Sequence, residues 1–177
     1  MTKYISLLRG INVSGQKKIK MADLRGLYSS LGFQNISSYI QSGNLVFDSE
    51  SSKPALIAGI LESAIKDAYS FEVPIIVISA QELAEIYNNN PFVANADTSK
   101  LYVAFLKEKS NLNKIDLSKW QTRDEQALIK GKQIYLYYPQ GYGKSKLTNN
   151  ILERELNISA TTRNWRTVHK LVELSKD

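Results

Sequence analysis

Basic and amide side chains gather in three short segments of the sequence, and each segment could bind an anion. The first segment follows an apolar run near the N-terminus and contains Arg9 and Asn12, with Gly15, Lys17 and Lys18 shortly after them. Glycines let backbone N–H groups approach an anion closely, and the lysines add positive charge. The alternative is a solvated connection between a strand and a helix, in which Arg9 pairs with a carboxylate of the protein.

The second segment, residues 138–146, reads YPQGYGKSK and leads into an expected helix. Lys144 and the N–H groups at the start of that helix favour an anion, and Tyr142 could stack on a base or another ring. The plainer interpretation makes Ser145 or Thr148 a helix cap.

The third segment, residues 161–167, reads TTRNWRT and lies at the start of the last expected helix. It combines hydrogen-bond donors with an indole and two guanidinium groups, and an arginine over Trp165 would form a cation–π contact. The alternative makes Trp165 an anchor of the core, with Asn164 or Thr162 as the helix cap.

Several chemistries are excluded by residue type. The chain has no cysteine and one histidine, which excludes thiolate catalysis, disulfides and zinc sites rich in either residue. The histidine, His169, flanks an apolar stripe, which favours a structural role over acid–base work. The carboxylates lack the spacing of a magnesium or calcium site, and Tyr138 stands where a P-loop needs its first glycine. There is no dinucleotide fingerprint either, so we expect no metal and no cofactor.

Hydrophobic periodicity predicts the elements that must position these segments. The predicted order is strand, helix, strand, strand, helix, strand and a trailing helix, and the same order then repeats after a polar linker at residues 88–99. A βαββαβ unit forms a four-stranded antiparallel sheet with both helices on one face. We therefore expect an α+β fold, a tandem repeat of two ferredoxin-like units at residues 1–90 and 91–177. The expected strands are 3–13, 35–40, 44–47, 73–78, 101–106, 126–129, 133–138 and 158–162, and the expected helices are 20–31, 54–69, a short one from 79, one around 115–120, 147–156 and 164–175.

The net charge of +6 is concentrated in the second half, where residues 99–177 carry 15 basic and 8 acidic groups. A basic half could attract nucleic acid. The stacking motif of an RNA-recognition module fails after Lys130-Gly131, so only a sequence-tolerant electrostatic contact is in question. The N-terminal segment does not resemble a signal peptide and no apolar run could span a membrane, so we expect a cytoplasmic location.

Three blocks of the sequence also resemble a known family. They read LLRGINVSGQKKIKMADLRGLYSSLGF, SYIQSGNLVFDS and TTRNWRTVHKLVEL, and they are similar to the bacterial family known as domain of unknown function 1697. The resemblance implies a pair of ferredoxin-like units and no settled activity. The motif positions that match are Arg9, Gly10, Asn12, Ser42, Gly43, Asn44, Arg163, Asn164 and Trp165.

The sequence favours a non-catalytic binding or regulatory protein with a site for a small anionic ligand. The ligand-binding residues would be Arg9, Asn12, Asn44, Arg163 and Asn164, with Trp165 and Lys144 as further candidates. This site requires the end of the first strand, the first hairpin and the start of the last helix to converge. Two other interpretations stay open: a nucleic-acid binder that uses the basic second half, and a small-molecule enzyme of unknown reaction. The latter needs a cleft that contains a residue with a strongly perturbed pKa. The oligomeric state is left open.

Overall fold

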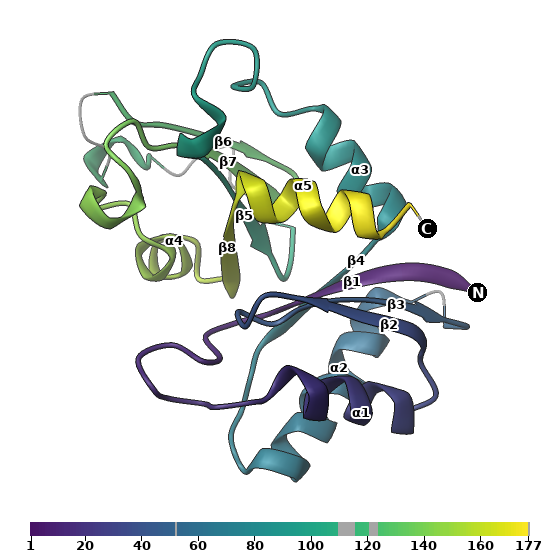
Figure 1. Ribbon diagram of the computed structural model, residues 1–177. Helices are drawn as coiled ribbons and strands as arrows, with labels where there is room; N and C mark the ends of the chain where they lie inside the picture. Colours follow the sequence, from purple (N-terminus) through teal and green to yellow (C-terminus); the bar gives the residue numbers. More distant parts are fainter. Residues whose placement is uncertain (52, 110–115, 121–123, 177) are drawn as a thin grey trace. The chain divides into compact units, whose positions relative to one another are not determined.

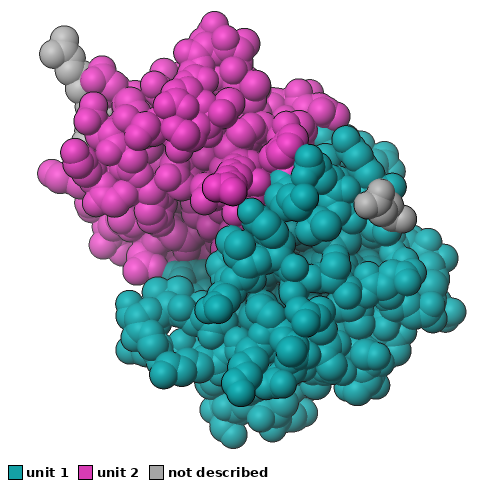
Figure 2. Space-filling model, viewed as in Figure 1, with its two compact units in different colours: residues 1–85, 170–177 teal, residues 86–169 magenta. Residues whose placement is uncertain are grey.

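The computed structural model describes residues 1–51, 53–109, 116–120 and 124–176, and it is an α+β protein (Figure 1). The described residues form two four-stranded antiparallel sheets and five α-helices. They divide into two compact units (Figure 2): unit 1 comprises residues 1–85 and 170–177, and unit 2 comprises residues 86–169. Each unit contains one of the sheets.

Unit 1 contains the sheet with strand order β2-β3-β1-β4. Every neighbouring pair in it is antiparallel, and the register of the central pair places Tyr4 opposite Phe47. The elements in chain order are β1 (Thr2–Leu8), α1 (Met21–Ser30), β2 (Gln34–Tyr39), β3 (Asn44–Ser49), α2 (Pro54–Tyr69), β4 (Ile75–Ser79) and the first residues of α3 (Ala80–Asn88).

Helices α1 and α2 cover one face of this sheet (Figure 1). The buried residues of α2 recur every three or four positions, which places them on one side of the helix. They pack with the sheet side chains Tyr4, Leu8, Leu45 and Phe47. One polar contact crosses this apolar layer, because the hydroxyl groups of Ser6 and Tyr28 hydrogen-bond at 2.9 Å and both residues are fully buried. Burial raises the pKa of Tyr28, so its phenol stays protonated.

Unit 2 contains the sheet with strand order β6-β7-β5-β8. This is the same order as in the first sheet, with each strand number raised by four. All of its pairs are antiparallel as well. The elements are the end of α3, β5 (Leu101–Leu106), β6 (Gln126–Lys130), β7 (Gln133–Tyr137), α4 (Asn149–Leu156), β8 (Ala160–Asn164) and the start of α5 (Trp165–Leu174), with 3₁₀ helices at Thr98–Lys100, Ser118–Trp120 and Tyr142–Lys144.

The two faces of the second sheet contact different helices. Ile134 and Leu136 pack in one apolar cluster with Leu152 and Leu156 of α4. Tyr135 lies between them on the strand and therefore points to the opposite face. Its hydroxyl donates a 2.8 Å hydrogen bond to the Ile86 carbonyl of α3. The end of α3 in unit 2 therefore contacts the face opposite α4, whereas the sequence predicted helices packed on one face of each sheet.

Most predicted elements are present, and the differences are at their ends. The first strand ends at Leu8 rather than at residue 13, because the backbone turns left-handed at Gly10 and Asn12. The helix expected at 115–120 falls partly outside the described residues, and Ser118–Trp120 forms one 3₁₀ turn. Among the described residues, no helix is both long and apolar enough to cross a membrane.

Candidate functional site

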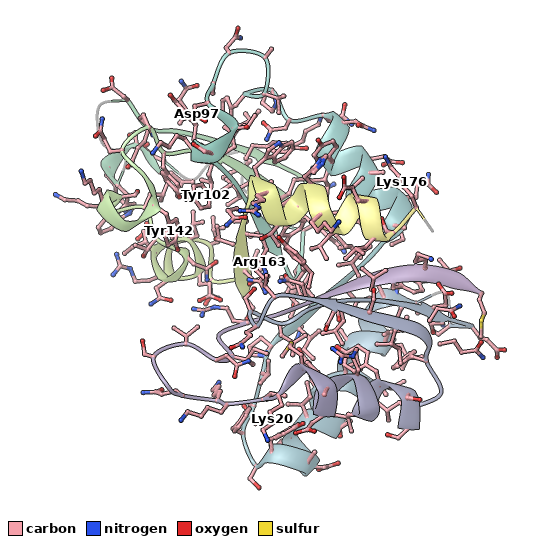
Figure 3. All side chains as sticks on the ribbon, in the orientation of Figure 1. Lys20, Asp97, Tyr102, Tyr142, Arg163 and Lys176 are labelled. Atoms are coloured by element: carbon pink, nitrogen blue, oxygen red, sulfur yellow. The ribbon has the colours of Figure 1, made fainter. Side chains whose placement is uncertain are left out.

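Unit 1 contains an open cavity of about 610 Å³ between the loop that follows β1, the start of α1, the β2–β3 turn and the end of α2. Its volume falls in the range of small-molecule sites. Three of its lining side chains are charged at neutral pH, and three others are largely apolar. The lining consists of Asn12, Gly15, Lys18, Ile19, Lys20, Met21, Asp23, Gln41 and Tyr69. In Figure 3, Lys20 lies at the entry to α1, next to the end of α2.

The wall of this cavity is the loop between β1 and α1, and its backbone is unusual. Five of its residues have positive φ: Gly10 (71°), Asn12 (55°), Ser14 (51°), Gly15 (75°) and Lys17 (46°). Non-glycine residues rarely adopt this conformation, and it costs about 1–2 kcal/mol for each of them. Residues in such conformations cluster at ligand sites, where the surrounding structure holds them in place.

Asn12 fixes this loop through its side chain. Its Nδ2 donates to the carbonyls of Ile19 at 2.9 Å and of Gln41 at 2.8 Å, and its Oδ1 accepts the N–H of Ile19 at 2.9 Å. Its own backbone N–H donates to the Lys17 carbonyl at 3.2 Å. Both amide protons of the Asn12 side chain are therefore used inside the protein. Asn12 therefore stabilises the loop that lines the cavity. The second lone pair of its Oδ1 is the one hydrogen-bonding position of the side chain left for a ligand.

The turn between β2 and β3 forms the neighbouring rim. The buried side chain of Asn44 donates to the Tyr39 carbonyl at 3.0 Å and to Ser42 Oγ at 2.9 Å, so it closes the turn from inside. Gly43 has φ 79°, and a Cβ there would lie 2.6 Å from Leu8 Cβ. Asn44 therefore stabilises the β2–β3 turn from inside, and Asn12 bonds to the same turn at the Gln41 carbonyl. The two predicted asparagines thus belong to one local structure.

The charges around the cavity are mixed, with an excess of positive charge. Lys18 and Lys20 are exposed, and Asp23 supplies the opposite charge from the first turn of α1. The N-cap position of α1 is Lys20, which makes no capping hydrogen bond with its side chain. The first N–H groups of the helix therefore add partial positive charge to this end of the cavity. Burial, and to a lesser extent the Asp23 carboxylate, raises the pKa of Tyr69.

Arg9, the third predicted residue in unit 1, lies directly after β1. Its backbone N–H donates to the Pro74 carbonyl at 2.9 Å, while Leu8 N–H donates to the Gly43 carbonyl at 2.8 Å. The end of β1 is therefore fixed on both sides, and the Arg9 side chain is half-buried. Arg9 does not line the cavity.

The other predicted residues belong to unit 2. The buried Arg163 donates from Nη1 to Thr161 Oγ1 at 2.7 Å and to the Thr162 carbonyl at 3.2 Å. Asn164 Oδ1 accepts the Thr167 N–H at 2.8 Å, so Asn164 caps α5. Arg163 and Asn164 are neighbours on β8, and these three bonds join each of them to residues no more than three positions away.

Trp165 is buried and stacks on Tyr87, with ring centroids 4.7 Å apart and planes 8° apart. The Tyr87 hydroxyl lies 2.8 Å from Nδ1 of His169. Trp165 and His169 therefore flank one aromatic side chain of α3, and this contact joins α3 to α5. Within the described part of the chain, no three His, Cys, Asp or Glu side chains lie close enough together to bind a metal.

Lys144 is exposed on the 3₁₀ turn at Tyr142–Lys144, beside a cluster of tyrosines. Tyr142 contacts Tyr102 and Tyr138 at centroid distances of 5.4 and 5.6 Å, and Figure 3 shows Tyr102 and Tyr142 near each other. The Tyr142 hydroxyl accepts a hydrogen bond from the Asn149 N–H at 2.9 Å, so it gives a partner to a backbone N–H in the first turn of α4. Thr148 Oγ1 caps the same helix through the Ile151 N–H.

The predicted set thus divides into a group in unit 1 and a group in unit 2, and its joint binding role stays a prediction. Sequence reasoning missed most of the cavity lining. It singled out Asn12, Gly15 and Lys18, but it did not find Asp23, Gln41 and Tyr69 as site residues. These three residues come from three different elements, so no local pattern connects them. The one available signal was the density of glycine, asparagine and lysine at residues 10–20.

Comparison with known proteins gives the family. A search of curated proteins found no match. A conserved bacterial protein, SP0830 from Streptococcus pneumoniae, has a similar solved structure with a TM-score of 0.77 and 26% sequence identity. The similarity covers 100% of this chain and 99% of that one. The model of the family described as "Protein of unknown function (DUF1697)" matches residues 1–135. The chain therefore belongs to the DUF1697 family, for which no function is established.

Proposed function

We propose that the protein is a non-catalytic binding protein whose unit 1 takes up a small organic anion in the cavity beside α1. The observation that carries this proposal is the convergence of Lys18, Lys20 and the uncapped start of α1 on one cavity of about 610 Å³. An anion there would receive hydrogen bonds from two ammonium groups and from backbone N–H groups at once. The loop fixed by Asn12 keeps this wall in place before the ligand arrives.

The lining favours binding over catalysis. It contains one carboxylate, Asp23, and no histidine or serine hydroxyl. Burial raises the pKa of Tyr69, so its side chain stays a protonated phenol at neutral pH and is not available as a base. The enzyme interpretation therefore receives no support from this cavity.

The proposal is tested by titrating ¹⁵N-labelled full-length protein with inorganic phosphate and with citrate, followed by amide chemical shifts. Saturable shifts at Gly15, Lys18 and Met21 are expected. The variant Lys18→Gln/Lys20→Gln should weaken binding about tenfold or more, because two charged hydrogen bonds are lost. Shifts that neither saturate nor respond to this variant would refute the site.

The chain offers a matched control for this variant. Lys130 and Lys132 are both exposed and have the same spacing around the β6–β7 turn. Lys130→Gln/Lys132→Gln therefore removes the same net charge in unit 2, and it should leave binding in unit 1 unchanged. Equal losses in both variants would show that the anions respond to the net charge of the chain.

A second candidate function is sequence-tolerant binding of nucleic acid through unit 2. Unit 1 contains ten basic and ten acidic residues, whereas unit 2 contains 13 basic and 7 acidic residues. The entire net charge of +6 thus belongs to unit 2. Affinity for a single-stranded oligonucleotide should then fall steeply as salt rises. No retention on heparin at low salt would contradict this function.

We further propose that the fold is a tandem repeat of two ferredoxin-like units, residues 1–90 and 91–177, in a bacterial cytoplasmic protein. The two sheets support the repeat, because their strand orders are identical after a shift of four strands. The solved structure from Streptococcus pneumoniae supports a bacterial origin, and the absence of cysteine fits a reducing compartment.

A further inference from the structure

The cavity in unit 1 has a negative side as well as a positive one. Lys20 and Asp23 both line it, at the N-cap position of α1 and three residues later. An N-cap residue and the residue three positions later lie at the same end of the helix, close enough in capping boxes for each side chain to reach the backbone N–H of the other. In the described part of the chain, neither side chain forms an ion pair with the other or with a third residue. Two opposite charges therefore face the same cavity a short distance apart.

Three of the other lining residues supply an apolar surface. Ile19 is 4% exposed and forms part of the core beneath the loop, while Met21 and Tyr69 are half-buried. A thioether and a phenol ring form a favourable surface for an aromatic or aliphatic side chain. Asp23 and Tyr69 line the same cavity. The negative side of the cavity is thus next to its apolar surface.

We infer that the cavity binds a free α-amino acid with an apolar side chain, which deepens the proposed function and rests on it. A free α-amino acid carries a carboxylate and an ammonium group on one carbon, so its two charges match Lys20 and Asp23 at short range. Lys18 and the first N–H groups of α1 also donate to the carboxylate, and the apolar side chain packs on Met21 and Tyr69. A peptide separates its two terminal charges by its whole length and fits this arrangement poorly.

Three ligands of nearly equal shape test the inference on the full-length protein: L-phenylalanine, 3-phenylpropanoate, which lacks the ammonium group, and phenethylamine, which lacks the carboxylate. Affinity is measured by the amide shifts of Gly15, Lys18 and Met21. L-phenylalanine should bind about tenfold more tightly than either analogue, because each analogue leaves one charge of the cavity unpaired. Glycine should bind more weakly than L-phenylalanine, because it lacks the apolar side chain.

The variant Asp23→Asn should remove the advantage of L-phenylalanine over 3-phenylpropanoate, because it lowers the affinity for L-phenylalanine. It should not weaken the binding of 3-phenylpropanoate, whose carboxylate then has one like charge fewer beside it. Asp67→Asn, at an exposed position on α2, is the matched control and should change neither. The comparison of the three ligands on the unaltered protein needs no variant, so it decides the question even if Asp23→Asn does not fold.

The outcomes separate this inference from the proposed function. Equal binding of L-phenylalanine and 3-phenylpropanoate, or binding of phosphate and citrate alone, overturns the amino-acid inference and leaves the anion site in place. Absence of saturable binding by all the anions overturns both. A preference for L-phenylalanine that persists in Asp23→Asn also overturns the inference, because the ammonium group would then be recognised elsewhere.

Discussion

Replacement of Asn12 tests how the wall of the cavity is built. Its side chain makes three hydrogen bonds of 2.8 to 2.9 Å, each worth about 1 kcal/mol net. Asn12→Ala removes all three and also places alanine at φ 55°, which costs about 1 kcal/mol more. We therefore expect Asn12→Ala to lower the free energy of unfolding of unit 1 by about 4 kcal/mol.

Two further substitutions divide this loss into its causes. Asn12→Gly also loses the three bonds but accepts the positive φ, so it should be about 1 kcal/mol more stable than Asn12→Ala. Asn12→Asp keeps the acceptor for the Ile19 N–H but points a carboxylate at the carbonyls of Ile19 and Gln41. It should therefore destabilise the loop despite its nearly identical shape.

Urea unfolding followed through the amide resonances of unit 1 gives the free energies, and hydrogen exchange gives the local effect. The backbone N–H of residue 12, bonded to the Lys17 carbonyl, is present in every variant and reports whether the loop stays closed. Its exchange should accelerate about a hundredfold or more in Asn12→Ala. A loss below about 1 kcal/mol with unchanged exchange would refute the reasoning, because the loop would then be fixed by other contacts.

Three further predictions concern stability. Gly43→Ala should cost about 2–4 kcal/mol in urea unfolding, because its Cβ would meet Leu8, whereas Gly32→Ala, also at positive φ but in open space, should cost about 1 kcal/mol. Burial raises the pKa of Tyr28, so the unfolded chain loses that proton first as pH rises. Stability should therefore fall above about pH 10, by up to about 1.4 kcal/mol per pH unit, and less steeply in Tyr28→Phe. Asn164→Ala should cost about 1 kcal/mol of thermal or urea stability, and Asn164→Asp, which keeps the cap of α5, should cost little.

The elements of the fold were predictable because their apolar residues follow regular periods. The spacing of Leu56, Ile57, Leu61 and Ile65, with Pro54 at the start, predicted α2 at the bounds that it has in the structure. The first strand was predicted too long for a related reason. Ile11 continues the apolar pattern and is 1% exposed, although it lies beyond the strand. Periodicity reports burial, and a buried loop residue satisfies it as well as a strand residue does.

The site was less predictable than the fold. Asn12 and Asn44 stand out as amides near glycines, but the sequence does not show that their protons are used by carbonyls of the protein. Asn164 had two interpretations of similar weight, a cap and a ligand-binding residue, and the bond to Thr167 shows that the cap exists. The lining of the cavity depends on where α2 ends relative to α1, which only tertiary packing determines.

The loop after β1 links these observations, because its conformation and its hydrogen bonds oppose each other. Asn12, Ser14 and Lys17 each adopt a backbone region that is unfavourable by about 1–2 kcal/mol. The three side-chain bonds of Asn12, at about 1 kcal/mol each, offset about half of that cost or more without any ligand. A loop that needed its ligand for this conformation would not contain such internal bonds. The anion would therefore meet a wall that is already formed, and its binding energy would not be consumed in ordering the loop.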